Sequence, residues 1–265
     1  MAAKIEIKPI KSRNFTESEA YKRLRTNIQF SGKEMKAIAF TSSAPGDGKS
    51  EVTMRTAWSL AELGKKVLYL DADLRNSSLL AKNEIHKELR GLAHYLVGDS
   101  SIDDIIVHTQ NPYLDLITIG AFPPNPSELL SQDGYKQLLA ELKNIYDYII
   151  IDTAPAGVVI DGVIACSAAD GVILVIAEGT VTDKVAKLTI DGLKQAKCKI
   201  IGSILNKCGQ KSGGGYGYGY GYGYGYGYGY GYGYGYGYGR REHTEGKKLF
   251  GKFSVPNIFK RGSKR

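Results

Sequence analysis

Twelve tyrosines alternate with glycines over residues 216–238 of this 265-residue chain. Each tyrosine has two neighbours that lack a side chain and have maximal backbone freedom. The tract therefore has little aliphatic surface whose burial would offset the entropy lost on ordering. We expect a disordered tract of solvent-reachable phenol groups. The folded part of the chain must then precede it, and we place its end near Cys208.

The formal net charge of +8 is concentrated behind this tract. Residues 240–265 hold nine Lys/Arg against Glu242 and Glu245, a net charge of +7, which leaves +1 for residues 1–239. A nearly neutral folded part offers no basic surface to DNA or RNA, so we predict no nucleic-acid partner. The basic tail also contains three phenylalanines. Two readings stay open for it: a solvated terminus, or a peripheral contact with an anionic membrane surface.

The cysteines indicate the compartment. Cys166, Cys198 and Cys208 are an odd number and lack metal-ligand spacing, which favours a reducing cytoplasm over a disulfide framework. The amino terminus has no secretory signal pattern, and the longest apolar runs are far shorter than the ~20 residues of a membrane span. We predict a cytoplasmic protein.

Short apolar runs alternate with longer amphipathic stretches from residue 16 to residue 208. This pattern is typical of βαβ units with a buried parallel sheet. We predict an α/β fold with a doubly wound and mostly parallel sheet. The predicted strands are 36–42, 65–70, 114–119, 147–151, 171–177 and 199–206. The predicted helices are 16–30, 49–63, 91–97, 127–145, 162–168 and 182–196.

The chain then divides into four predicted parts. Residues 1–35 form an amino-terminal segment with a helix, in which Thr16 and Glu19 have the spacing of a capping box. The catalytic domain is expected at 36–208, the linker and Gly-Tyr tract at 209–239, and the basic tail at 240–265.

A phosphate-binding loop is predicted where the first long strand meets its helix, at residues 43–50, SAPGDGKS. Gly46 and Gly48 permit a tight turn whose N–H groups converge on a phosphate. Lys49 supplies a cation for the β- and γ-phosphates, and Ser50 supplies a hydroxyl for Mg²⁺. The strand–loop–helix context favours a nucleotide site over a chance Gly-Lys-Ser sequence, and it assigns the predicted sheet to the P-loop NTPase type.

Two further predicted strands end in carboxylates. Asp71 and Asp73 follow the strand over 65–70, and Asp152 follows the strand over 147–151. Because the carboxyl ends of parallel strands line the ligand crevice, we expect these carboxylates to face the bound phosphates. The alternative for Asp71 and Asp152 is a local role in capping the turns that follow.

Taken together, these elements resemble the bacterial tyrosine kinases of capsule and exopolysaccharide biosynthesis, of the stand-alone cytoplasmic type. The resemblance covers residues 16–208, and the segments that carry it are 19–28, 41–50, 71–75, Gly120 with 123–130, and 151–155. It implies Walker A, A′ and B motifs, the cofactors ATP and Mg²⁺, and trans-autophosphorylation of a carboxy-terminal tyrosine cluster. It also implies a homo-oligomeric ring and a membrane-anchored activator of polysaccharide export, which would recruit the kinase to the inner face of the cell membrane.

The resemblance and the motifs together assign roles to individual residues. The predicted catalytic residues are Lys49, Asp71, Asp73 and Asp152, with Asp71 as the base for the acceptor phenol. The predicted nucleotide contacts are Gly46, Asp47, Gly48, Lys49, Ser50, Glu51 and Asn206, and a turn-forming role stays open for Asn206. The predicted Mg²⁺ ligands are Ser50, Asp71 and Asp152. The predicted phosphoacceptors are Tyr216, Tyr218, Tyr220, Tyr222, Tyr224, Tyr226, Tyr228, Tyr230, Tyr232, Tyr234, Tyr236 and Tyr238, and the predicted oligomerisation residues are Glu19, Lys22 and Arg25.

Three positions depart from the family pattern. Lys22 replaces the first arginine of a Glu-x-x-Arg-x-x-Arg motif and lacks its planar, bidentate fork. Ser43 replaces the usual first glycine of the loop. Glu51 stands where a small hydroxyl residue often follows the Walker A serine, and we expect its carboxylate to point away from the phosphates.

Two other functions are weighed against a kinase. A partitioning or positioning ATPase of the deviant-Walker class would hydrolyse ATP without phosphorylating protein. That class has an extra lysine early in the loop, where this chain has Ala44, so the sequence favours the kinase. A non-enzymatic, cohesive role for the tract is disfavoured because its high glycine content weakens β-zipper packing.

Overall fold

The computed structural model describes residues 3–7, 14–77 and 89–209. All of them belong to the first of two units into which the chain divides, residues 1–213. The second unit, 214–265, holds the Gly-Tyr tract and the basic tail and lies outside the described residues. The four-part division therefore stays a prediction.

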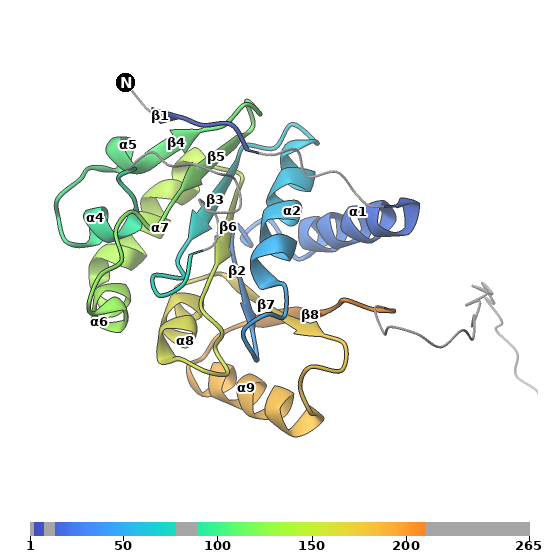
Figure 1. Cartoon of the computed structure of the whole chain (residues 1–265). Coiled ribbons are helices and arrows are strands. Elements are labelled where there is room, and N and C mark those ends of the chain that lie inside the picture. The colour runs from blue at the N-terminus through green and yellow to red at the C-terminus, as the bar shows by residue number, and fades with distance from the viewer. Residues whose placement is uncertain (1–2, 8–13, 78–88, 210–265) are drawn as a thin grey trace, which may run out of the picture. The chain divides into compact units, whose positions relative to one another are not determined.

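In the described part of the chain, eight strands form one sheet in the order β1-β4-β5-β3-β6-β2-β7-β8 (Figure 1). The strands are β1 Ala3–Lys4, β2 Ala37–Ser42, β3 Val67–Asp71, β4 Ile106–His108, β5 Leu114–Ile117, β6 Tyr148–Asp152, β7 Gly171–Ala177 and β8 Ile200–Asn206. Strands β4 and β5 pair antiparallel and the other neighbours pair parallel. The predicted doubly wound, mostly parallel α/β fold is confirmed.

Helices cover both faces of this sheet (Figure 1). They are α1 Phe15–Phe30, α2 Lys49–Ala61, α4 Leu92–Leu96, α5 Ile102–Ile105, α6 Pro126–Ser131, α7 Asp133–Ile145, α8 Ile160–Ser167 and α9 Asp183–Gln195. None of the described helices is long and apolar enough to cross a membrane.

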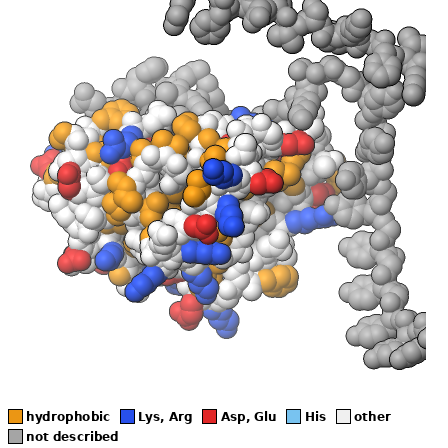
Figure 2. Space-filling view, turned by 90° about the horizontal axis from the view of Figure 1, so that it is seen from below, with side chains coloured by type: hydrophobic (Ala, Val, Ile, Leu, Met, Phe, Trp, Pro, Cys, Tyr) orange, Lys and Arg blue, Asp and Glu red, His pale blue; other side chains and the backbone are white. Residues whose placement is uncertain are grey.

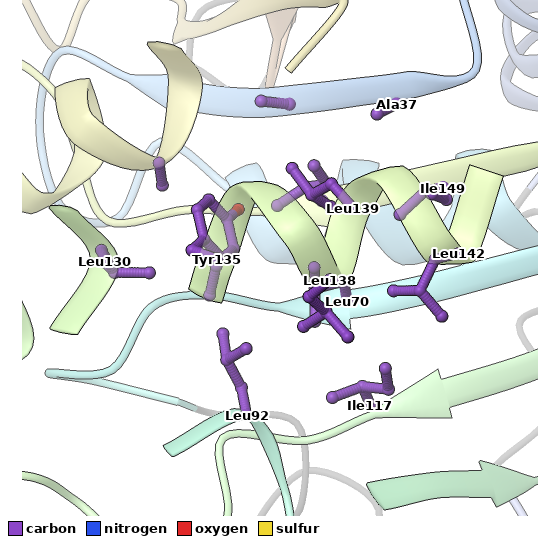
Figure 3. Packing of buried hydrophobic residues seen from close by; sticks show 14 of the residues in the cluster. Ala37, Leu70, Leu92, Ile117, Leu130, Tyr135, Leu138, Leu139, Leu142 and Ile149 are labelled. Carbon is purple, nitrogen blue, oxygen red and sulfur yellow. The ribbon is translucent and has the colours of Figure 1, made fainter. Parts of the chain in front are cut away.

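The strand period of two divides the buried side chains between two cores. On β2, Ala37 and Ala39 belong to the core under α7, whereas Ile38 and Phe40 belong to the core under α2. Figure 3 shows the first core, where one face of α7 packs on the sheet through Tyr135, Leu138, Leu139 and Leu142. Because β2 is buried on both faces, it holds the start of the loop that follows it in one position.

The structure corrects the prediction of one helix over 127–145. The chain forms α6 and α7 instead, separated by Gln132, whose extended backbone (φ −69°, ψ 155°) no helix can include. The break allows Leu130 of α6 and Tyr135 of α7 both to be buried in the same core. Apolar periodicity continues across the break, so the sequence pattern did not reveal it.

The predicted capping box at the start of α1 is also wrong. Asn14 is the N-cap, and its Oδ1 accepts a hydrogen bond from the Glu17 N–H at 2.8 Å. Strands β1 and β4 and helix α5 were not predicted, because each has only two to four residues and so shows no measurable period.

Candidate nucleotide-binding site

A glycine-rich loop connects β2 to α2. Gly46 (φ 83°) and Gly48 (φ 84°) have left-handed backbones, and Gly48 is the N-cap of α2. A Cβ atom on Gly48 would lie 2.3 Å from Nδ2 of Asn206, so the position accepts only glycine for two independent reasons. The loop thereby presents the N–H groups at the start of α2, the geometry that binds phosphate.

This loop forms one wall of a cavity of about 460 Å³, a usual size for a small-ligand site. The cavity lies at the carboxyl ends of the parallel strands, where β2 has β6 on one side and β7 on the other. Its walls are Ser42, Ala44 to Glu51, Asp73, Arg75, Asn76, Ala154, Pro155, Val158, Val159 and Lys207.

Lys49 joins the loop to the acidic strand ends. Its Nζ lies 2.6 Å from Oδ1 of Asp152 and 3.7 Å from Oδ2 of Asp73, and 3.4 Å from the Ser50 hydroxyl. Burial alone would lower the pKa of Lys49, but the attraction of Asp152 and Asp73 outweighs it, so the pKa is raised. The lysine is therefore held as a cation at the cavity wall.

The three predicted carboxylates come together but differ in their access to the cavity. Asp71 and Asp152 are paired positions on neighbouring strands and are almost fully buried. Asp71 accepts hydrogen bonds from the Asp73 N–H (3.2 Å) and the Ser77 hydroxyl (2.5 Å). Burial, and then the charge of Asp152, raises its pKa to about 7. Asp73 instead lines the cavity, and burial raises its pKa as well.

Sequence reasoning did not identify Tyr69 as part of the site. Its hydroxyl donates to Oδ2 of Asp152 at 3.0 Å, while Lys49 occupies Oδ1. Both oxygens of Asp152 are thus held, which fixes the carboxylate in front of Lys49. Tyr69 has the pattern of a core residue in β3, so no local signal could have singled it out.

Three predicted nucleotide contacts have structural partners of their own. The carboxylate of Asp47 accepts from the Ala44 N–H (3.1 Å) and the Thr180 hydroxyl (2.8 Å). The amide of Asn206 donates to the carbonyl oxygen of Asp47 at 2.9 Å, so it supports the loop. Glu51 lines the cavity, but its carboxylate pairs with Arg55 at 3.1 Å, one turn further along α2.

The cavity also includes Arg75 and Lys207, to which no role was assigned. Arg75 forms an ion pair with Asp161 at the start of α8. Nζ of Lys207 donates to the carbonyl oxygen of Gly46 at 2.7 Å. Arg75 ends the segment 71–75 and Lys207 directly follows Asn206. Their proximity in sequence to predicted site residues was the signal that could have identified them.

The predicted oligomerisation residues lie on α1 and not at the cavity. Lys22 pairs with Glu19 within the helix at 2.7 Å. Arg25 donates to the carbonyl and hydroxyl oxygens of Ser59 on α2, at 3.1 and 3.2 Å. The twelve predicted phosphoacceptor tyrosines lie outside the described residues.

The residues at the cavity fit a Mg²⁺ ion that is bound together with a nucleotide and coordinated partly by its phosphates. Among the described residues, no three His, Cys, Asp or Glu side chains form a ready metal cluster. Mg²⁺ usually takes only one or two protein carboxylates and completes its octahedron with phosphate oxygens and water. Ser50 beside Lys49, with Asp152 on the facing strand, supplies such a partial set.

The loop, its lysine and the carboxylates at the ends of β3 and β6 define a P-loop nucleotide-binding protein. A family model described as "AAA domain" matches residues 35–201. The tyrosine-protein kinase CpsD of Streptococcus agalactiae is 41% identical over 205 residues, which cover 77% of this chain and 90% of that protein. The kinase domain of the Escherichia coli tyrosine kinase ETK superposes with a TM-score of 0.70 at 35% identity, covering 76% of this chain and 80% of that one.

The chain belongs to the bacterial tyrosine kinases, the family that the sequence predicted. A second similarity concerns the alternative function. The septum site-determining protein MinD of Pyrococcus horikoshii, complexed with Mg-ADP, has a TM-score of 0.56 at 29% identity, covering 67% of this chain and 72% of that one. The lower score and identity do not favour an ATPase switch over a kinase.

Proposed function

We propose that the chain transfers phosphate from Mg-ATP to the tyrosines of its own Gly-Tyr tract, and that this reaction regulates capsular or exopolysaccharide synthesis and export. The observation that carries the proposal is the position of Lys49, which lines the cavity at the glycine-rich loop and forms ion pairs with Asp152 and Asp73. The similarity to kinases named for tyrosine supports the choice of acceptor.

The chain's own residues divide the work of phosphoryl transfer. Bound Mg²⁺ would neutralise charge on the transferring phosphate, and Ser50 and Asp152 are the residues that would hold it. Asp71, which the sequence also predicted as a Mg²⁺ ligand, is given the role of base instead. Lys49 and the N–H groups of residues 46–50 would hold the phosphates, since the loop has the required left-handed glycines. Asp152 and Tyr69 orient Lys49 from the buried side.

A tyrosine ionises near pH ~10, so a neutral phenol needs a base. Asp71 is the proposed base, and its pKa of about 7 suits that role. Asp73 assists, because it lines the cavity and its N–H donates to Asp71. The backbone of Asp73 thus helps to hold the Asp71 carboxylate in place.

Each tyrosine of the tract has the same neighbours, so the local sequence gives an active site no means of choosing one tyrosine over another. About 18 residues separate Gly209 from the middle of the tract, which gives a coil with an r.m.s. span of ~25 Å. That reach allows transfer in trans inside a homo-oligomeric ring. A membrane-anchored activator of polysaccharide export would hold this cytoplasmic kinase at the inner face of the membrane.

Intact-mass spectrometry after incubation with Mg-ATP tests the activity and its substrate together. We expect stepwise phosphate additions confined to Tyr216–Tyr238 in the native chain. Ser50→Ala should lose most of them, because the Mg²⁺ hydroxyl is gone while the buried Lys49–Asp152 pair is kept. Lys49→Met should lose all of them, although a melting curve must accompany it because Asp152 loses its cation. Ser167→Ala, on the exposed end of α8, is the control.

Hydrolysis of ATP by the native chain without any mass addition would contradict the kinase and support the ATPase alternative. Full modification of Ser50→Ala would instead contradict the assignment of the site.

We further propose that the basic tail contacts anionic lipid until phosphorylation neutralises it. Each phosphotyrosine adds about −1.5 to −2 charges, so four or five would outweigh the +7 of residues 240–265. Co-sedimentation with anionic vesicles should show binding of the native chain that phosphorylation or high salt weakens. A chain lacking 240–265 that binds equally well would show that the tail does not contact the membrane.

A further inference from the structure

Lys207 reaches the phosphate-binding loop from the side opposite to Lys49. Lys49 points to Asp152 and Asp73, at the ends of β6 and β3, which lie on one side of β2. Lys207 follows β8, which lies on the other side of β2 beyond β7, and its Nζ donates to the Gly46 carbonyl at 2.7 Å. The loop thus lies between two lysines.

The backbone of Lys207 is strained. Its φ of 58° is left-handed, a conformation in which the Cβ atom crowds the following carbonyl oxygen. In the described part of the chain the other non-glycine residue with positive φ is Lys197 (φ 59°), just after α9, where a left-handed residue commonly ends a helix. Lys207 follows a strand and ends no helix, so its strain points to function.

This backbone carries the Lys207 side chain across the loop. Its Cε lies 3.7 Å from the place that a Cβ on Gly48 would take, and the residue lines the cavity. The ammonium group therefore stands at the N-terminus of α2, where the phosphates of a nucleotide are expected.

The cations that line the cavity differ in their partners. Lys49 is ion-paired with Asp152, and Arg75 is ion-paired with Asp161. The hydrogen bond that the structure records for Lys207 goes to a neutral carbonyl. An anionic ligand can consequently approach this ammonium group without separating an ion pair.

We propose that Lys207 is a nucleotide-binding residue whose ammonium group exchanges the Gly46 carbonyl for an oxygen of the nucleotide's phosphate chain. It gives the site a second cation, on the far side of the loop from Lys49, and it selects for the anionic part of the ligand. The inference rests on the proposed function only for the identity of the ligand, a nucleoside triphosphate.

Calorimetric titration of the full chain with a non-hydrolysable ATP analogue, with competition by adenosine, tests this role. Lys207→Met should weaken the Kd for the analogue by about tenfold, because a charged hydrogen bond is lost, and should leave the Kd for adenosine unchanged. Lys207→Arg should keep most of the affinity. High salt should shrink the difference between the native chain and Lys207→Met, which a purely structural role would not produce.

Two variants separate charge from strain. Lys197→Met removes a lysine with the same backbone conformation outside the cavity and should bind as the native chain does. Lys207→Gly relieves the strain and should melt no lower than the native chain, yet bind the analogue as weakly as Lys207→Met.

Native affinity in Lys207→Met, or an equal loss for the analogue and adenosine, would overturn the inference. If Lys207→Met binds the analogue normally but Lys49→Met does not bind it, only the role of Lys207 is overturned and the proposed function stands. A folded native chain that binds no analogue at all would overturn both.

Discussion

At the level of single residues, the three carboxylates of the site differ in their hydrogen-bond partners and in their access to the cavity. Asp152 is held on both oxygens, by Lys49 and Tyr69. Asp71 is buried between Ser77 and the Asp73 backbone, whereas Asp73 reaches the cavity. Burial, and to a lesser extent the negative charge of Asp152, raises the pKa values of Asp71 and Asp73. The arrangement suits groups that exchange protons.

The assignment of Asp71 as base predicts a division between catalysis and binding. Asp71→Asn should lower kcat by about 10²–10⁴-fold, the usual contribution of a general base, and leave the Kd for ATP near the native value. The fold should tolerate the amide, because its oxygen can still accept from the Asp73 N–H and the Ser77 hydroxyl can turn to accept.

Asp73→Asn should have the smaller effect on kcat, and Asp103→Asn, a carboxylate exposed on α5, should have none. Steady-state kinetics with quantified phosphotyrosine measures all three variants. A larger loss in Asp73→Asn than in Asp71→Asn would move the role of base to the residue that lines the cavity.

At the level of elements, α1 is attached to the body mainly through α2. Ile28 is buried, Arg25 bonds to Ser59, and Arg55 of α2 lies 5.7 Å from the centre of the Tyr21 ring. Two members of the predicted oligomerisation motif therefore differ in their surroundings. Arg25 already holds the helix in place, while Lys22 pairs only within α1 among the described contacts.

This difference predicts separable effects on stability and assembly. Arg25→Ala should lower the free energy of unfolding by about 1 kcal/mol, since hydrogen bonds between the helices are lost. Lys22→Ala should change it by less than about 0.5 kcal/mol, yet reduce the ring measured by sedimentation velocity. Lys33→Ala, in the exposed turn after α1, is the control. An unchanged sedimentation profile for Lys22→Ala would remove Lys22 from the subunit contact.

At the level of the whole molecule, the chain has a first unit, residues 1–213, whose cavity is lined by Lys49, and a second unit, residues 214–265, which contains the predicted acceptor tyrosines and the basic tail. The described residues end at Gly209, three residues after β8 and two after Lys207, which lines the cavity. The predicted linker to Tyr216 therefore begins, in sequence, next to a residue of the cavity wall, and its ~25 Å reach does not by itself decide which copy is modified.

Mixing two chains with complementary defects decides whether phosphate is transferred within one copy or between copies. A Lys49→Met chain retains the acceptors and lacks the catalytic lysine, while a chain truncated before Tyr216 retains catalysis and lacks the acceptors. Intact-mass spectrometry should find phosphate on the Lys49→Met chain in the mixture and none when it is incubated alone. Absence of phosphate from the mixture, with an active native control, would indicate transfer within one subunit.

The sequence by itself determined what depends on neighbours along the chain. The phosphate-binding loop, the carboxylates after the apolar runs at 67–71 and 148–152 and the buried parallel strands could all be predicted, because side-chain period and turn chemistry act over a few residues. Composition alone set the Gly-Tyr tract apart from the predicted folded domain, and its role as the substrate stays a prediction. The helix boundary at Gln132 was missed because it depends on how Leu130 and Tyr135 both reach one core. The Asn14 cap is a local contact and was missed because Thr16 and Glu19 offered a competing capping pattern.

Only the tertiary structure decided which distant residues meet. Tyr69 reaches Asp152 across 83 positions, Arg75 reaches Asp161 across 86, and Lys207 reaches Gly46 across 161. These contacts depend on the strand order β3-β6-β2-β7-β8, which sets the neighbours of the loop on each side. No local pattern encodes that order, because it results from burying every strand between two layers of helices at once.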